Sequence, residues 1–175
     1  MKPDQTPAVA ICSYYHLADF LDRQDIGHVV SIMSDTEWKR FPALSFGNRK
    51  VLRLQFDDVG YASDKLVAAS REHIAGLIDF GRTWNGAGTL LCHCRAGASR
   101  SSAAAMIVAA AVRPSSWMAV TTRVAQARAY YTPNSRLLSL ADEILGLKPG
   151  LVDLVQSLAR PDRIDDWQPA VIPLD

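Results

Sequence analysis

Cysteine is scarce in this chain. There are 3 cysteines, an odd number with no paired spacing, which argues against a disulfide framework and favours a reducing compartment. An excess of charge of one sign is also missing, because 19 lysines and arginines against 18 aspartates and glutamates leave a net charge of +1. No overall field therefore attracts nucleic acid or an anionic membrane. Attraction for an anion has to come from a local group of residues.

Long hydrophobic runs and targeting signals are absent as well. Residues 1–13 contain no basic segment followed by an apolar core, and the apolar run 102–112 is too short to cross a bilayer. We therefore expect a cytoplasmic protein without a membrane span. With 175 residues, 49% of them hydrophobic, the chain can bury a full core as one domain. That domain is expected over residues 1–175, with a loose N-terminus at 1–7 and a C-terminal tail at 161–175.

Hydrophobic periodicity predicts alternating strands and helices early in the chain and mainly helices later. Strands are expected at 8–12, 27–33, 51–56 and 89–92, and helices at 17–21, 65–84, 102–112, 114–130, 136–145 and 151–158. Ser63 and Asp64 are expected to cap the second helix, and 34–49 is interpreted as a long connection. This order is typical of an α/β fold with a mainly parallel sheet of four or five strands and helices on both faces.

The most informative segment joins the last of these strands to the alanine-rich helix. It reads His93-Cys94-Arg95-Ala96-Gly97-Ala98-Ser99-Arg100-Ser101. A buried strand that leads through a small loop into a helix points several backbone N–H groups at one spot, and such a loop binds an oxyanion such as phosphate. A thiol beside those amides, a helix N-terminus and a guanidinium favours the thiolate form. Cys94 is therefore a candidate nucleophile and Arg100 a candidate anion ligand.

A plainer interpretation is a core strand that leads into a core helix, with Cys92 and Cys94 as small buried residues. Two arginines and two serines interrupt the apolar pattern where the strand ends, however, which is costly for simple packing. The phosphate-loop interpretation is favoured for this reason. Cys92 by itself is assigned to the core, since it lies two positions before the loop.

The segment resembles the signature of the cysteine-dependent protein-tyrosine and dual-specificity phosphatases, in which His-Cys, five residues and Arg precede Ser or Thr. The resemblance implies that Cys94 attacks phosphorus, that Arg100 binds two phosphate oxygens and that Ser101 helps the thiolate to leave. It also implies that His93 orients the loop and supports the thiolate, while Gly97 allows a tight backbone. The expected phosphate-binding residues are Arg95, Ala96, Gly97, Ala98, Ser99 and Arg100.

Two further matches extend the resemblance over roughly 51–145. In Phe56-Asp57-Asp58, at the end of an expected strand, Asp58 matches the general acid of the family, although adjacent aspartates are also common turn formers. In Pro133-Asn134, Asn134 matches the residue that supports the loop or the attacking water, and it is also a good helix cap. A compact, bacterial-like member with the dual-specificity-phosphatase fold is implied.

The resemblance implies two-step hydrolysis of a phosphomonoester through a phosphocysteine, with no metal or cofactor. Ala96 and Ala98 stand where relatives acting on phosphoinositides often have lysines, which favours a phosphorylated protein as substrate. Phosphotyrosine is the first candidate, with dual specificity for phosphoserine and phosphothreonine also open. Inositol phosphates or another small phosphomonoester remain an alternative. Nucleic acid is not expected as a partner, and the oligomeric state is open.

Two interpretations from other classes compete with a phosphatase. A phospho-binding pseudophosphatase would keep Arg100 but lose Cys94 or the acid, and both are present here. A rhodanese-type sulfurtransferase also uses a cysteine in an anion-binding loop. The Arg-Ser ending of the loop and the matches at Asp58 and Asn134 argue against the sulfurtransferase.

Overall fold

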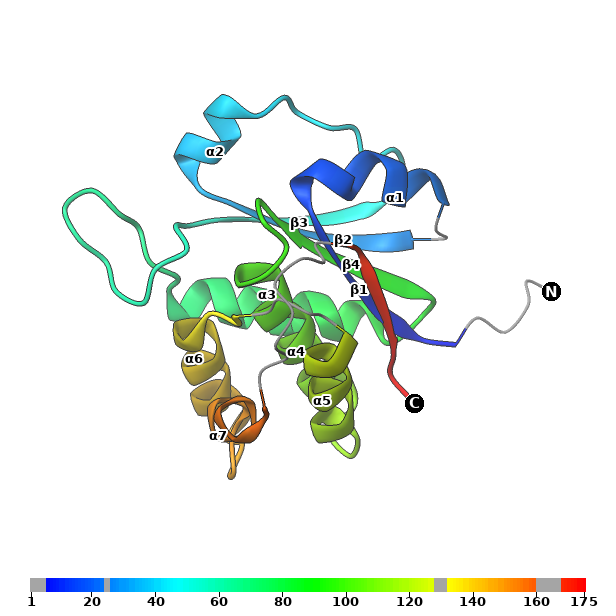
Figure 1. The fold of residues 1–175 in the computed structure, drawn as a ribbon, viewed down its shortest axis with the longest axis vertical. Helices are drawn as coiled ribbons and strands as arrows, with labels where there is room; N and C mark the ends of the chain where they lie inside the picture. The colour runs from blue at the N-terminus through cyan, green and yellow to red at the C-terminus, as the bar shows by residue number, and fades with distance from the viewer. Residues whose placement is uncertain (1–5, 24–25, 128–131, 160–167) are drawn as a thin grey trace.

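The computed structural model of the chain describes residues 6–23, 26–127, 132–159 and 168–175 (Figure 1). Its strands are β1 (Ala8–Ser13), β2 (Ile26–Met33), β3 (Lys50–Gln55), β4 (Thr89–Cys94) and β5 (Ala170–Pro173). Its helices are α1 (Leu17–Arg23), α2 (Asp35–Arg40), α3 (Arg71–Trp84), α4 (Arg100–Val112), α5 (Trp117–Ala127), α6 (Ser135–Leu145) and α7 (Leu151–Ser157), and η1 (Tyr14–His16) is a short 3-10 helix.

The strands form one 5-stranded sheet in the order β3-β2-β4-β1-β5. Strands β3, β2, β4 and β1 run parallel to one another, and β5 runs antiparallel to β1 at one edge. The expected mainly parallel sheet is therefore confirmed. Because parallel strands end at the same edge of a sheet, the segments that follow β1, β3 and β4 come together there. Ser13 at the end of β1 pairs directly with Cys94 at the end of β4.

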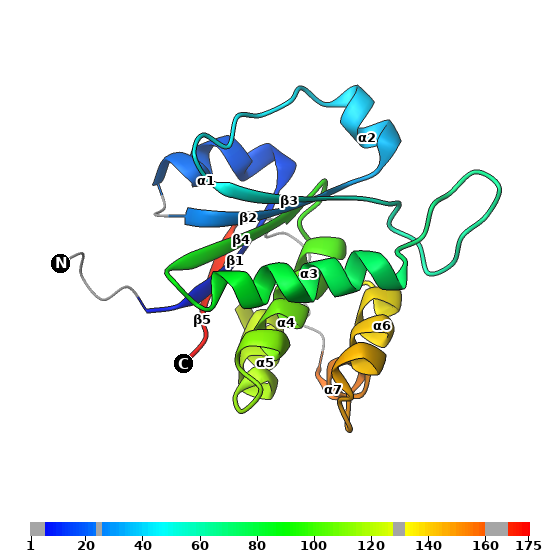
Figure 2. The same cartoon turned by 180° about the vertical axis from the view of Figure 1, so that it is seen from behind.

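Helices cover both faces of this sheet. In Figures 1 and 2, α1 and α2 lie on one side, and α3 to α7 lie on the other. The alanine-rich α4 is buried from Arg100 to Ala110 and contacts α3, α5 and α6, so the expected central helix is confirmed. Alternate residues of a strand face opposite sides of the sheet. Cys92 and Cys94 accordingly belong to the larger core around α4, whereas Cys12 belongs to the smaller core beneath α1.

The helix expected at 65–84 is shorter than its pattern suggested. It begins at Arg71, with Ser70 rather than Ser63 or Asp64 as the capping residue. Both backbone groups of Val67 are hydrogen-bonded to Asp57. The N–H of Val67 donates to the side chain of Asp57 at 2.7 Å, and the C=O of Val67 accepts from the backbone N–H of Asp57 at 2.7 Å. These bonds close the segment between β3 and α3 into a loop, and a residue paired in this way cannot take part in a helical turn.

The connection expected at 34–49 contains a helix that the sequence interpretation missed. Ser34 caps α2 and forms a capping box with Glu37, a pattern that is readable as Ser-x-x-Glu. The helix expected from 114 starts at Trp117, and four residues of the expected tail form β5. Residues 1–5, 128–131 and 160–167 lie outside the described residues. Within the described ranges, no helix combines the length and the apolarity needed to cross a membrane.

Candidate active site

The segment between β4 and α4 is a tight loop fixed from outside through its carbonyl groups. The carbonyl of Arg95 accepts from the N–H of Tyr14 at 3.2 Å, that of Ala98 from Thr132 at 3.1 Å, and that of Ser99 from Asn134 at 3.4 Å. A trans peptide unit points its C=O and the following N–H in opposite directions. The N–H groups that follow these three carbonyls therefore face the inside of the loop, where an oxyanion would be bound.

Cys94 sits at the start of this loop and is 1% exposed. Its Sγ accepts a hydrogen bond from the N–H of Gly97 at 3.2 Å and lies 3.2 Å from Oγ of Ser101. The structure therefore brings three of the expected site residues together at one sulfur. A backbone N–H and a hydroxyl are the donors that stabilise negative charge on a thiolate.

Arg100 is the first residue of α4, and its guanidinium is held before any substrate is bound. Nη1 donates to Oε2 of Glu37 at 2.8 Å and to the carbonyl of Phe56 at 3.1 Å, while Nη2 donates to Oε1 of Glu37 at 2.8 Å. A guanidinium has five N–H bonds. The two that remain, on Nε and Nη2, lie on one edge, and this edge matches two oxygens of a phosphate.

Glu37 was missed as a site residue because it was placed in a connection. In the Arg100–Glu37 pair Arg100 is buried and Glu37 is partly buried, with 4% and 14% of the two side chains exposed. Burial by itself would raise the pKa of Glu37, but hydrogen bonds from Arg100 and from the backbone of Ser34 outweigh it and leave that pKa below its usual range. Burial likewise opposes the charge on Arg100, and the bonds to Glu37 outweigh it and raise the pKa of Arg100. Both groups are therefore charged at neutral pH.

Asp58 lies beside the same guanidinium, three residues after the end of β3. Its Oδ1 accepts from the hydroxyl of Ser99 at 2.7 Å and from the side-chain amide of Asn134 at 2.8 Å. Its Oδ2 lies 3.8 Å from Nε of Arg100. Asn134 also caps α6, as the sequence suggested, because its side-chain oxygen accepts from the N–H groups of Arg136 and Leu137. The residues expected from separate segments thus converge on one carboxylate.

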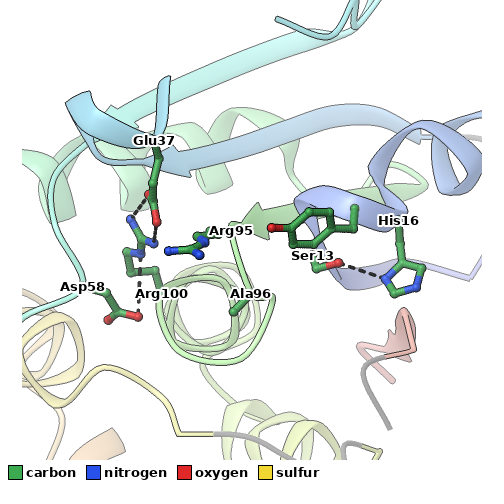
Figure 3. Close-up of a pocket in the computed structure, with 8 residues that line it drawn as sticks. Ser13, His16, Glu37, Asp58, Arg95, Ala96 and Arg100 are labelled. Carbon is green, nitrogen blue, oxygen red and sulfur yellow. Dashed lines mark hydrogen bonds and ion pairs between the residues drawn. The ribbon is translucent and has the colours of Figure 1, made fainter. Parts of the chain in front are cut away.

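A cavity of about 460 Å³ opens over this cluster (Figure 3). It is lined by Ser13, Tyr15, His16, Glu37, Asp58, Arg95, Ala96 and Arg100. In Figure 3, Arg100 lies between Glu37 and Asp58, while Ser13 and His16 lie on the far side of Ala96. Ser13 ends β1, and Tyr15 and His16 follow it in η1. No sequence motif marks these three residues, and the pairing of β1 with β4 brings them here. Among the described residues, no three His, Cys, Asp or Glu side chains form a metal-binding group.

His93 lies away from the sulfur of its neighbour. It is 0% exposed, and its ring centroid lies 6.0 Å from that of Phe46, a member of the core on the opposite face of the sheet from Cys94. Burial lowers the pKa of His93 to about 4, so the imidazole is neutral at pH 7. It therefore supplies no positive charge to the thiol at that pH. Its expected support of the loop stays a prediction.

The lowered pKa of His93 predicts a loss of stability in mild acid. The unfolded chain takes up a proton near pH 6.5 and the folded chain only near pH 4. The contribution of His93 to the free energy of unfolding is thus fully present above pH 6.5. It is lost as the pH drops from 6.5 to 4, by about 3 kcal/mol in total. Urea unfolding at pH 7.5 and pH 5 should show a loss about 2 kcal/mol smaller in His93→Gln than in the parent. Equal losses in both proteins would contradict this prediction.

Comparison with solved structures identifies the fold. DUSP15 superposes with a TM-score of 0.60 at 19% identity, over 88% of this chain and 94% of that one. A human tyrosine phosphatase-like serine/threonine/tyrosine-interacting protein gives 0.63 at 17% identity, over 81% and 93%. PTPMT1 in complex with PI(5)P gives 0.57 at 14% identity, over 86% and 94%. No protein-family model and no curated protein matches the chain. The chain therefore has the fold of the dual-specificity phosphatases, as its sequence predicts.

Proposed function

We propose that this protein hydrolyses phosphomonoesters through a phosphocysteine intermediate, and that its substrate is a phosphotyrosine side chain of a protein. The observation that carries the proposal is the cluster around Cys94, in which a sulfur in contact with the N–H of Gly97 and the hydroxyl of Ser101 lies in the same loop as a pre-oriented guanidinium. A bound phosphoryl group would contact the inward N–H groups and the free edge of Arg100. Electrostatic stabilisation of this kind is the largest contribution in most phosphoryl-transfer sites.

The reaction has two steps. In the first, the Cys94 thiolate forms an S–P bond, the bond from phosphorus to the ester oxygen breaks, and Asp58 gives its proton to that oxygen. In the second, water forms an O–P bond and gives a proton to Asp58, while the S–P bond breaks. Ser101 donates a hydrogen bond to the departing thiolate, since its Oγ lies 3.2 Å from Sγ of Cys94.

The cavity supports an aryl ester. Beyond the phosphate position it has room for a ring, and the exposed ring of Tyr15 forms part of its wall. The side chains of Ala96 and Ala98 add no charge, so Arg95 is the one additional cation of the loop. Because inositol polyphosphates need several cations, we expect phosphotyrosyl peptides to be hydrolysed faster than inositol phosphates. A panel of both substrates, compared by kcat/KM, tests this preference.

The test of the chemistry is turnover of an aryl phosphate by three proteins. The parent should release phosphate, and Cys94→Ser should fall to the background rate, since a hydroxyl without a general base is a poor nucleophile. Cys92→Ala is the matched control, because Cys92 is a buried cysteine on the same strand and lies two residues before the loop. It should keep its kcat.

Two outcomes would contradict the proposal. A parent that binds phosphopeptides but shows no turnover would be a phospho-binding pseudophosphatase. A parent that forms thiocyanate from thiosulfate and cyanide, and releases no phosphate, would be a sulfurtransferase. Acid quench of the working enzyme should trap phosphate on Cys94, and mass spectrometry of that peptide reads the site directly.

A further inference from the structure

The two oxygens of Asp58 have different surroundings. Oδ1 accepts two hydrogen bonds, from Ser99 at 2.7 Å and from Asn134 at 2.8 Å. Oδ2 has no hydrogen-bond partner among the described residues and faces the Nε side of Arg100 at 3.8 Å. A carboxylate oxygen has two lone-pair directions. At Oδ1 both are occupied by donors, which leaves no position there for a proton.

The hydrogen bonds of Asn134 fix which of its side-chain atoms faces Oδ1 of Asp58. Its side-chain oxygen accepts from the backbone N–H groups of Arg136 and Leu137, at 3.1 and 3.2 Å. Since an oxygen has to face these two donors, the amide nitrogen has to face Asp58. Asn134 is therefore a donor to Asp58, and the amide cannot be turned over without losing two bonds at the start of α6.

Ser99 connects the acid to the phosphate loop itself. It directly precedes Arg100, and its carbonyl is bonded to the N–H groups of Ala103 and Asn134. The loop that would bind the phosphoryl group thus also holds the carboxylate, through one hydroxyl. The other end of the segment that carries Asp58 is tied down where Arg136 donates to the carbonyl of Ala69 at 2.6 Å.

We propose that Ser99 and Asn134 are positioning residues. By occupying Oδ1 of Asp58 they leave Oδ2 as the oxygen that carries the transferred proton, and they orient Oδ2 toward the leaving oxygen. This inference rests on the proposed function. In the first step the proton moves from Oδ2 to the ester oxygen as the P–O bond breaks, and in the second step Oδ2 takes the proton from water. Oδ1 keeps its two hydrogen bonds throughout.

The inference predicts that Ser99 matters only where proton donation matters. Esters with poor leaving groups, such as phenyl phosphate, need the acid, whereas 2,4-dinitrophenyl phosphate leaves well without a proton. Ser99→Ala frees one lone-pair direction of Oδ1 and loosens the carboxylate. We expect kcat/KM for phenyl phosphate to fall by roughly 10- to 100-fold, with a change under about threefold for the dinitrophenyl ester.

Three variants make the test specific. Ser99→Thr keeps the hydroxyl and should restore most of the activity toward phenyl phosphate. Ser102→Ala is the matched control, because Ser102 is buried on α4 and its Oγ has no hydrogen-bond partner among the described residues; it should be unchanged toward both esters. Asp58→Asn removes the acid, and adding Ser99→Ala to it should cause little further loss, since Ser99 acts through Asp58.

The outcomes separate this inference from the proposed function. An equal loss toward both esters in Ser99→Ala, or a full additional loss in the Asp58→Asn background, would overturn the positioning role while leaving a phosphatase. Absence of Cys94-dependent turnover in the parent would overturn the proposed function instead. Thermal melting of each variant identifies any loss that comes from unfolding.

Discussion

Replacing Arg100 by lysine should lower kcat toward an aryl phosphate by about 10³-fold or more. The guanidinium uses three of its N–H groups on Glu37 and Phe56 and still offers an edge of two to the substrate. An ammonium is a point charge with three donors and no planar edge. A lysine that replaced all three of these hydrogen bonds, to Glu37 and to the carbonyl of Phe56, would have no donor left for the phosphoryl oxygens. Steady-state kinetics below the melting temperature of the variant measure the effect.

The same substitution should also destabilise the fold. Glu37 is partly buried, and a lysine leaves part of its carboxylate without a donor, which costs about 1–3 kcal/mol. Arg82→Lys, at a side chain of α3 that is 57% exposed, controls for the change of side chain and should alter neither quantity. Near-normal turnover in Arg100→Lys would show that the phosphoryl group is not bound as described here.

Gly97→Ala should also lower kcat toward an aryl phosphate, because it displaces the loop rather than removing a ligand of the phosphoryl group. Gly97 has φ of 73°, in the left-handed region, and a Cβ built on it would lie 2.6 Å from the backbone nitrogen of Ser13 and 2.7 Å from the carbonyl carbon of Cys12. Those atoms belong to β1 inside the sheet and cannot move aside as a flexible side chain could. The loop has to shift instead, and a shift of about 1 Å at a catalytic group costs roughly 10²-fold in rate.

Gly146→Ala is the matched control for this prediction. Gly146 also has a positive φ, 66°, but its Cβ would meet no atom within 4 Å. It should show only the cost of a left-handed alanine, about 1–2 kcal/mol, with kcat unchanged. If Gly97→Ala lost no more activity than Gly146→Ala, the close approach of the loop to β1 would not matter for catalysis.

Local sequence was enough to place the loop between a strand and a helix. The run 89–92 is apolar after Thr89, and the alanines after Ser101 have high helix propensity. The elements on either side of the nonapeptide therefore follow from residues within a few positions. The helix after Asn134 was readable for the same reason, since a cap and an amphipathic pattern adjoin each other. The helix after Ser34 was readable too, through its capping box, and was passed over.

Hydrogen bonds between segments that are distant in the chain could not be predicted from the sequence. The segment before Arg71 has a helical composition, but the bonds between Asp57 and Val67 hold it as a loop. The antiparallel β5 at the edge of the sheet depends on where the end of the chain meets β1. In both cases a contact across many residues outweighs the local preference, because propensities differ by fractions of a kcal/mol per residue.

By itself the sequence determined the chemical groups of this site: a thiol in a glycine-containing loop, an arginine at the start of a helix, and a candidate acid after another strand. Only the tertiary structure decided how they are held. It gave Arg100 a partly buried carboxylate partner in Glu37, turned His93 to the opposite face of the sheet, and attached Asp58 to Ser99 and Asn134 through one oxygen. The physical reason is that residue types set which bonds are possible, whereas the meeting of β1, β2, β3 and β4 at one edge sets which of them form.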